Sequence, residues 1–236
     1  MLDILGAIFG TAAYAVIVGA LIGYSPLRTP AKLAAYAAAA SWGILVVAIG
    51  ALGGFAPGAT GPVPAPVLAF VVLLALLFAG WYFVPRFRQA ATGVPLPALV
   101  GVNIARLGGL FFILVAEDGR LSGPFPPIAG GGDILVGALA IPLAALAARR
   151  ADAHTGLLRA WNALGALDLI VAIALGALSA PGTPIRVFTE GPGTLAMTTL
   201  PWAIVPAMLV PIYLLIHFVI AMKLRSSAHV GHAFAT

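Results

Sequence analysis

Five polar side chains interrupt apolar segments in the second half of the sequence. They are Asn103, Arg106, Asn162, Asp168 and His217. An arginine and an aspartate can form an ion pair or bind a charged ligand, a histidine can carry a proton, and the two amides can donate and accept hydrogen bonds. Ionisable groups within apolar segments are costly and by default mark functional sites. We therefore expect these five residues to line a binding site.

The composition shows what kind of structure must hold these residues. Of the 236 residues, 62% are hydrophobic and 8% are charged, and the mean hydropathy is +1.11. Soluble domains are about 45–50% apolar and about 25% charged. A chain with so little polar surface cannot cover a water-soluble globule, so lipid must cover most of it. The sequence predicts an integral membrane protein with the lipid bilayer as its main partner.

The apolar segments predict an all-α fold with seven transmembrane helices. Their expected positions are 2–24, 32–54, 63–84, 95–116, 131–148, 157–180 and 202–224. Each is close to the roughly 20 residues that span a bilayer. The whole chain, 1–236, then forms one membrane domain. Within it we expect a three-helix scaffold part at 1–94, a four-helix part with the buried polar residues at 95–225, and a cytoplasmic tail at 226–236.

The distribution of cations predicts the orientation in the membrane. Nine of the 12 Lys and Arg residues fall in connections on one side of the seven segments, two fall on the other side and Arg106 lies within a segment. Cytoplasmic loops carry an excess of Lys and Arg. The N-terminus is therefore expected outside and the C-terminus in the cytoplasm, in a bacterial-type inner membrane.

The helical rise predicts which buried groups meet. Counted from the cytoplasmic side at 1.5 Å per residue, Arg106 lies about 16 Å and Asp168 about 15 Å into the membrane. A buried Arg costs roughly 2.5–3.5 kcal/mol on insertion scales, and a carboxylate at the same depth offsets this cost. We expect an Arg106–Asp168 ion pair. Asn103 shares a helix face with Arg106, and His217 lies near the depth of Asn103, with Asn162 somewhat shallower.

These residues favour a transporter or a ligand-binding protein for a small molecule or an ion. Arg106 would bind an anionic group or gate through Asp168, and His217 would carry a proton. Each residue also has a structural interpretation, because amides and histidines often bond between membrane helices and a closed ion pair can simply lock two helices. An accessory subunit of a larger membrane complex is an alternative function. The sequence leaves open whether the chain binds another protein or a second copy of itself.

An enzyme is a further alternative, since a single carboxylate can carry out acid–base catalysis on a lipid-like substrate. The candidate catalytic residues are Asp168, Asp133 and Glu117. Asp133 follows three glycines at the expected start of the fifth segment, where capping the helix N-terminus is its favoured role. The preceding stretch 122–127 is expected to be a constrained loop. The long connection 181–199 is the better candidate for a lid over the outer end.

Tryptophans and prolines refine the expected helices. Trp81, Trp161 and Trp202 lie at expected helix ends, as interfacial anchors do. Pro206 and Pro211 lie inside the seventh segment, where each removes a backbone hydrogen bond. The carbonyls they free can contact an ion or a substrate if they line a cavity.

Several classes of function are excluded by missing residues. The chain has no cysteine, which removes disulfides, thiol catalysis and cysteine-ligated metals. Its two lysines, Lys32 and Lys223, lie at the cytoplasmic edge and cannot hold a buried Schiff base. No motif for a nucleotide, a metal or a serine hydrolase is present. We expect no metal, no cofactor and no nucleic-acid partner.

Overall fold

The computed structural model describes the backbone of residues 1–233, and their side chains except those at 150, 152 and 226–233. Within this range every regular element is a helix. Seven helical stretches are long and apolar enough to cross a membrane. The described part of the chain is thus all-helical, and its seven apolar stretches fit a multi-pass membrane protein.

Five of the seven stretches are single helices, and two are composite. The single helices are α1 (Leu2–Gly23), α2 (Thr29–Ala51), α3 (Ala65–Phe83), α7 (Phe125–Arg150) and α8 (Thr155–Leu178). The fourth stretch joins α5 (Leu96–Gly101), the 3₁₀ segment η1 (Val102–Gly109) and α6 (Leu110–Glu117). The seventh joins the π-helical segment η4 (Val205–Leu209) to α9 (Val210–Ala233). Short helices α4 (Pro85–Gly93), η2 (Asp152–His154) and η3 (Leu195–Thr198) lie in connections.

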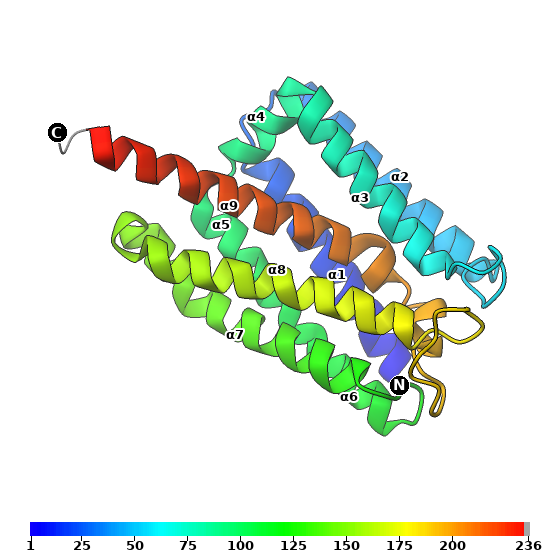
Figure 1. Cartoon of the computed structure of the whole chain (residues 1–236). Helices are drawn as coiled ribbons and strands as arrows, with labels where there is room; N and C mark the ends of the chain where they lie inside the picture. Colours follow the sequence, from blue (N-terminus) through cyan, green and yellow to red (C-terminus); the bar gives the residue numbers. More distant parts are fainter. Residues whose placement is uncertain (234–236) are drawn as a thin grey trace.

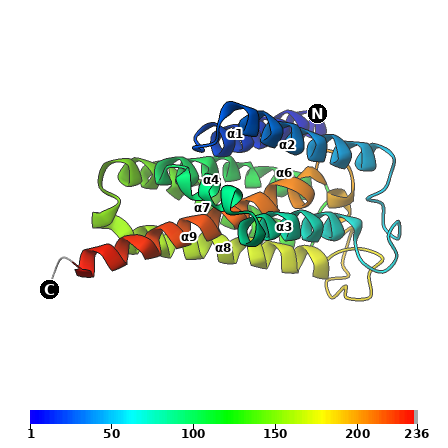
Figure 2. The ribbon, with the colours of Figure 1, turned by 90° about the horizontal axis from the view of Figure 1, so that it is seen from above.

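The long helices run side by side along one axis (Figure 1). The N-terminus, the α2–α3 connection and the segment between α8 and α9 lie at one end, which we call the outer end because the cation distribution predicts that it faces outside. Helix α4 and the α7–α8 connection lie at the opposite end. Viewed from above, α1 and α2 form one edge of the bundle and α8 lies at the other (Figure 2).

Helix α9 is the central helix of the bundle. The seventh stretch is the most deeply buried of the seven, whereas α2 is the least buried. Helix α9 contacts α3, α5 and α8, and most of the main apolar cluster surrounds it. A side chain on α9 can therefore reach helices from both halves of the sequence.

The fifth stretch begins earlier than its sequence predicts. Helix α7 starts at Phe125, not at 131, and therefore includes Pro126 and Pro127 in its first turn. Proline fits that turn because the first N–H groups of a helix have no intrahelical acceptor. The second half of the loop expected at 122–127 is thus helix, and the three glycines at 130–132 lie inside α7.

Those glycines allow α7 to touch the backbone of η1. A Cβ atom on Gly130 would lie 2.8 Å from the carbonyl oxygen of Gly109, and one on Gly137 would lie 2.8 Å from the Leu107 nitrogen. Because real Cβ atoms do not approach so closely, only glycine fits these positions. In η1, Asn103, Arg106 and Gly109 recur every third residue on its buried face, as 3₁₀ geometry requires.

The three tryptophans expected as interfacial anchors are buried inside the protein. Trp81 is 5% exposed, and Trp161 and Trp202 are each 3% exposed. The Trp161 indole donates a hydrogen bond to the Val136 carbonyl at 3.1 Å. The prediction of anchors at the headgroups is wrong, because all three rings pack within the bundle and the indoles of Trp161 and Trp202 donate to protein acceptors.

The prolines of the seventh stretch coincide with a change in helix type. Pro206 lies in η4, and Pro211 lies in the first turn of α9. Pro211 has no N–H, so no α-helical bond reaches the carbonyl of Ala207. The indole of Trp42 from α2 donates to that carbonyl at 3.0 Å. One freed carbonyl is therefore occupied by the protein itself.

The last helix continues past the seventh candidate membrane span, which ends at Arg225. Helix α9 continues to Ala233, so most of the segment assigned to a tail extends the last helix. Residues 234–236 lie outside the described part of the chain.

Candidate functional site

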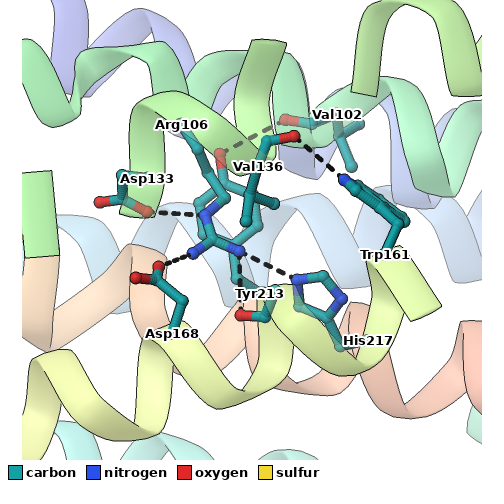
Figure 3. A network of polar contacts seen from close by, with 9 residues as sticks. Val102, Arg106, Asp133, Val136, Trp161, Asp168, Tyr213 and His217 are labelled. Carbon is teal, nitrogen blue, oxygen red and sulfur yellow. Dashed lines mark hydrogen bonds and ion pairs between the residues drawn. The ribbon is translucent and has the colours of Figure 1, made fainter. Parts of the chain in front are cut away.

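The centre of the site is the guanidinium of Arg106, which lies between two carboxylates. Its Nε donates a hydrogen bond to Asp133 Oδ1 at 2.6 Å, and its Nη2 donates to Asp168 Oδ2. The side chain of Arg106 is 1% exposed, against 16% for Asp133 and 9% for Asp168. The three residues come from η1, α7 and α8 (Figure 3). The expected Arg106–Asp168 pair is present, and Asp133 is an additional partner.

The remaining guanidinium nitrogen, Nη1, faces α8 and α9. It donates to the carbonyl oxygen of Gly165 at 3.1 Å, and it lies 3.0 Å from Nε2 of His217. Since a guanidinium only donates hydrogen bonds, Nε2 must be the acceptor. Four protein acceptors thus surround Arg106 and account for four of its five N–H donors.

Asn162 fixes the other side of the His217 ring. Its Oδ1 lies 2.9 Å from His217 Nδ1, and its Nδ2 donates to the His217 carbonyl at 3.0 Å. With Nε2 accepting from Arg106, Nδ1 carries the hydrogen and donates it to Asn162. His217 is therefore a neutral ring with both nitrogens bonded.

Aromatic side chains pack against the guanidinium and the imidazole of the site. The Arg106 Cζ atom lies 5.7 Å from the centre of the Tyr213 ring, within the range of a cation–π contact. The Tyr213 hydroxyl donates to the Val102 carbonyl at 3.3 Å. Trp161 packs beside His217, with ring centres 5.6 Å apart.

Two glycines make room for the charged groups. A Cβ atom on Gly132 would collide with Asp168 Oδ1, and one on Gly165 would lie 2.8 Å from His217 Nε2 and 3.2 Å from Arg106 Nη1. Any larger residue would displace the ion pair or the histidine. The site therefore requires glycine at positions 132 and 165 as well as the polar side chains.

The site carries more negative than positive charge when both carboxylates are ionised. One arginine faces two aspartates, and His217 is neutral. Each aspartate uses one oxygen for Arg106, and its other oxygen makes no hydrogen bond within the described residues. No group of three or more His, Cys, Asp or Glu side chains among those residues is arranged to hold a metal ion. An uncompensated charge of this kind is unstable in a low-dielectric interior.

Two cavities meet at Asp133 from the outer half of the bundle. One has a volume of about 90 Å³ and is walled by Phe70, Phe112 and Phe125 among other apolar residues. The other, of about 60 Å³, runs along Arg106 toward Trp202. Asp133 lines both, whereas Asp168 lines neither. Asp133 is therefore the more accessible carboxylate.

A polar contact fastens the outer end of the second cavity. Oδ1 of Asp3 accepts hydrogen bonds from Arg120 Nη1 and from Trp202 Nε1, each at 2.8 Å. These bonds join the start of α1 to the α6–α7 connection and to the turn before η4. We call this group of three residues the outer clasp.

Two residues expected at the site are not joined to it. Asn103 is fully buried, but its Nδ2 donates to the Leu99 carbonyl at 2.9 Å and its Oδ1 has no partner in the structure. Glu117 is exposed at the end of α6. The site thus contains four of the five expected binding residues and two of the three candidate catalytic carboxylates.

The interpretation of Asp133 as a helix cap is wrong. The residue lies in the third turn of α7, about 12 Å from its start, and binds Arg106 instead of the helix N-terminus. The error came from the late start assigned to this helix. The signal available in the sequence was the pair Pro126 and Pro127, which favours a helix start at that point. Sequence reasoning also missed Tyr213 and the Gly165 carbonyl.

The comparisons with known proteins give a family but no activity. A family model described as a domain of unknown function (DUF8737) matches residues 63–225, which runs from just before α3 to within α9 and contains the whole site. No curated protein and no solved structure matches the chain.

Proposed function

The chain belongs to this DUF8737 family, and we propose that it is a proton-coupled membrane transport protein whose proton is held by Asp133. The single observation that carries the proposal is the excess carboxylate beside Arg106 in the middle of the bundle. Paired carboxylates that share one cation, with an accessible free oxygen, are suited to taking up and releasing a proton.

Charge balance supports a bound positive species at this site. Arg106 neutralises one carboxylate, and the second has no other cation within the described residues. A proton on Asp133 makes the cluster neutral, and the Asp168–Arg106 pair remains ionised. Loss of that proton leaves a net negative charge that favours its return.

A proton fits the site better than a metal cation. Hard metal cations take six or more oxygen ligands, whereas Asp133 and Asp168 offer only one free oxygen each. The surrounding walls of the larger cavity are almost entirely apolar. A proton needs one carboxylate oxygen and no ligand shell, so these walls do not oppose it.

Access to the site differs between its two sides. Both small cavities approach Asp133 from the outer half, with the outer clasp above one of them. On the side of α8 and α9, His217 and Asn162 connect to Arg106 through a chain of hydrogen bonds. A buried charged site that small cavities approach from the outer half suits a transporter that alternates its access. The cation bias of the connections supports an N-terminus outside, and we propose a bacterial-type inner membrane as the location.

The enzyme alternative has less support from the geometry. The apolar cavity at Asp133 measures about 90 Å³, less than the roughly 150 Å³ that accommodates benzene. A lipid-like substrate therefore has no space beside the carboxylate. Glu117, the third candidate, is exposed and apart from any cavity described here.

Infrared difference spectroscopy of the protein in lipid tests the proton site directly. A protonated aspartate gives a carboxylic-acid carbonyl band, which we expect at neutral pH in the natural protein and not in Asp133→Asn. Glu117→Gln is the matched control, since it removes an exposed carboxylate and should keep the band. An unchanged band in Asp133→Asn overturns the assignment of the proton.

Transport is tested in liposomes with an imposed pH gradient. The outside solution is an extract of small metabolites, and mass spectrometry identifies solutes that accumulate only when the gradient is present. We expect gradient-dependent accumulation with the natural protein and with Glu117→Gln, and none with Asp133→Asn. If the infrared band behaves as expected but no solute accumulates in any sample, the protein holds a proton without being a transporter, and the proposed function is wrong.

A further inference from the structure

A large cavity lies between the first three helices and α9, away from the charged site. Its volume is about 420 Å³, nearly three times the roughly 150 Å³ cavity that accommodates benzene. It is lined by residues of α1, α2, α3, α4, α5 and α9 and of the α1–α2 connection. The proposed function makes no use of this space.

The polar groups on the cavity wall are all satisfied within the protein. The Tyr14 hydroxyl donates to the Ala39 carbonyl at 2.8 Å, and the Ser25 hydroxyl donates to the Ile22 carbonyl at 2.6 Å. The Trp42 indole donates to Ala207, as described above. None of these donors is left for a ligand, so the occupant of the cavity must be a hydrocarbon group.

The cavity reaches the lipid-facing surface of the bundle. Leu76 on its wall is 58% exposed, and Ala38 on α2 is also exposed. These residues face the region where acyl chains surround a membrane protein. A hydrocarbon chain can therefore enter sideways from the bilayer.

Helix α4 covers the end of the cavity that lies opposite the N-terminus. Phe87, Ala90 and Ala91 of α4, followed by Val94, line the cavity at positions i, i+3, i+4 and i+7, which form one helical face. Arg86 and Arg88 flank this face and are exposed. Helix α4 is therefore amphipathic and lies where a membrane surface would meet the bundle.

The charges that the first half of the chain places at this end are all positive. Arg28, Arg86 and Arg88 are exposed, and their side chains form no hydrogen bond or ion pair within the described residues. Leu27, next to Arg28, lines the cavity as Phe87 does on α4. The sequence has no Asp or Glu between Asp3 and Glu117. Three arginines therefore attract an anionic group at this end. No carboxylate from residues 4–116 repels it.

We propose that the cavity binds one acyl chain of an anionic phospholipid from the adjacent leaflet. The chain occupies the apolar space among α1, α2, α3 and α9, and the phosphate-bearing headgroup lies among Arg28, Arg86 and Arg88. The apolar wall selects a hydrocarbon chain, and the arginines select a negative headgroup. This lipid would hold α2 and α3 against the central helix.

Native mass spectrometry of the full chain tests the proposal with two defined lipids. Phosphatidylglycerol and phosphatidylcholine with identical acyl chains are added in turn. We expect one tightly retained phosphatidylglycerol, with at least tenfold weaker retention of phosphatidylcholine. Equal retention of the two lipids, or none of either, overturns the proposal.

Two variants separate the chain site from the headgroup site. Ala35→Phe fills the cavity and should abolish retention of the lipid, whereas Ala34→Phe adds the same ring to the exposed neighbouring position and should retain it. Arg86→Gln with Arg88→Gln should remove the preference for phosphatidylglycerol. The arginine variant leaves the cavity wall unchanged, so it decides the proposal even if Ala35→Phe fails to fold. An unchanged preference in that variant contradicts the headgroup assignment.

Discussion

Nη1 of Arg106 donates its hydrogen bond to Nε2 of His217 across 3.0 Å, and this direction fixes the state of the histidine. A proton on Nε2 would place two donors against each other, one of them a permanent cation. Asn162 completes the arrangement by accepting from Nδ1 at 2.9 Å. The histidine thus works as a neutral bridge between η1 and α8, and the proton-carrying role is better assigned to Asp133.

The first prediction concerns this bridge. His217→Leu removes the acceptor of Arg106 and the donor to Asn162, and each buried group left without a partner costs about 1–3 kcal/mol. His217→Gln keeps an acceptor in the same region and should lose less. Thermal unfolding in a lipid mimetic measures the difference. If the carbonyl band of the protonated carboxylate survives in a folded His217→Gln protein, His217 is not the proton carrier, as we expect.

The second prediction concerns the balance of charge. Neutralising Arg106 and Asp168 together would leave the Asp133 carboxylate without a cation, because Arg106 pairs with both aspartates. We expect Arg106→Met alone to destabilise the protein by about 3–5 kcal/mol, since it leaves both carboxylates without their cation. The triple variant Arg106→Met, Asp133→Asn, Asp168→Asn should recover most of this loss.

The same triple variant separates a structural role from transport. If the triple variant is stable but has lost gradient-driven accumulation, the three charged residues take part in transport. A stable triple variant that still transports would show that the cluster only locks the helices. Unfolding midpoints and the liposome assay, measured on the same preparations, distinguish the two results.

The sequence predicted the membrane helices and one ion pair because both depend on local quantities. Apolar length and turn formers mark each span, and a fixed rise of about 1.5 Å per residue places Arg106 and Asp168 at one depth. Neither inference requires knowledge of how the helices are packed. The meeting of Arg106 with Asp168 followed from depth and from the high cost of an unpaired charge in lipid.

The rest of the site depends on packing that the side-chain pattern does not encode. Asp133 was misplaced because a six-residue error at the start of α7 moved it from the helix interior to a helix end. The Gly165 carbonyl contributes as backbone, and the 3₁₀ form of η1 leaves no mark in composition. Trp161 shows the same limit, since a tryptophan near a helix end has the same sequence signal whether it faces headgroups or protein.

The third prediction concerns the contact between α7 and η1. Gly130→Ala places a methyl group 2.8 Å from the Gly109 carbonyl oxygen, where backbone must move. Overpacking of this kind costs typically 1–3 kcal/mol. Gly131→Ala is the matched control on the same helix, because nothing lies within 4 Å of its added methyl group. We expect only Gly130→Ala to lower the unfolding midpoint, and equal midpoints would contradict the close approach of the two helices.

The last prediction concerns Trp42 and Pro211, which act on the same carbonyl of α9. Because Pro211 cannot donate to Ala207, the Trp42 indole supplies the missing hydrogen bond at 3.0 Å. Trp42→Phe keeps an aromatic ring but leaves the carbonyl without that donor, which we expect to cost about 1 kcal/mol. Pro211→Ala restores a backbone N–H next to this carbonyl. Trp42→Phe should therefore cost less in the Pro211→Ala background than alone, and unfolding free energies of the four proteins form a double-mutant cycle that measures the coupling. A coupling of zero would mean that the indole bonds to α9 without compensating for the proline.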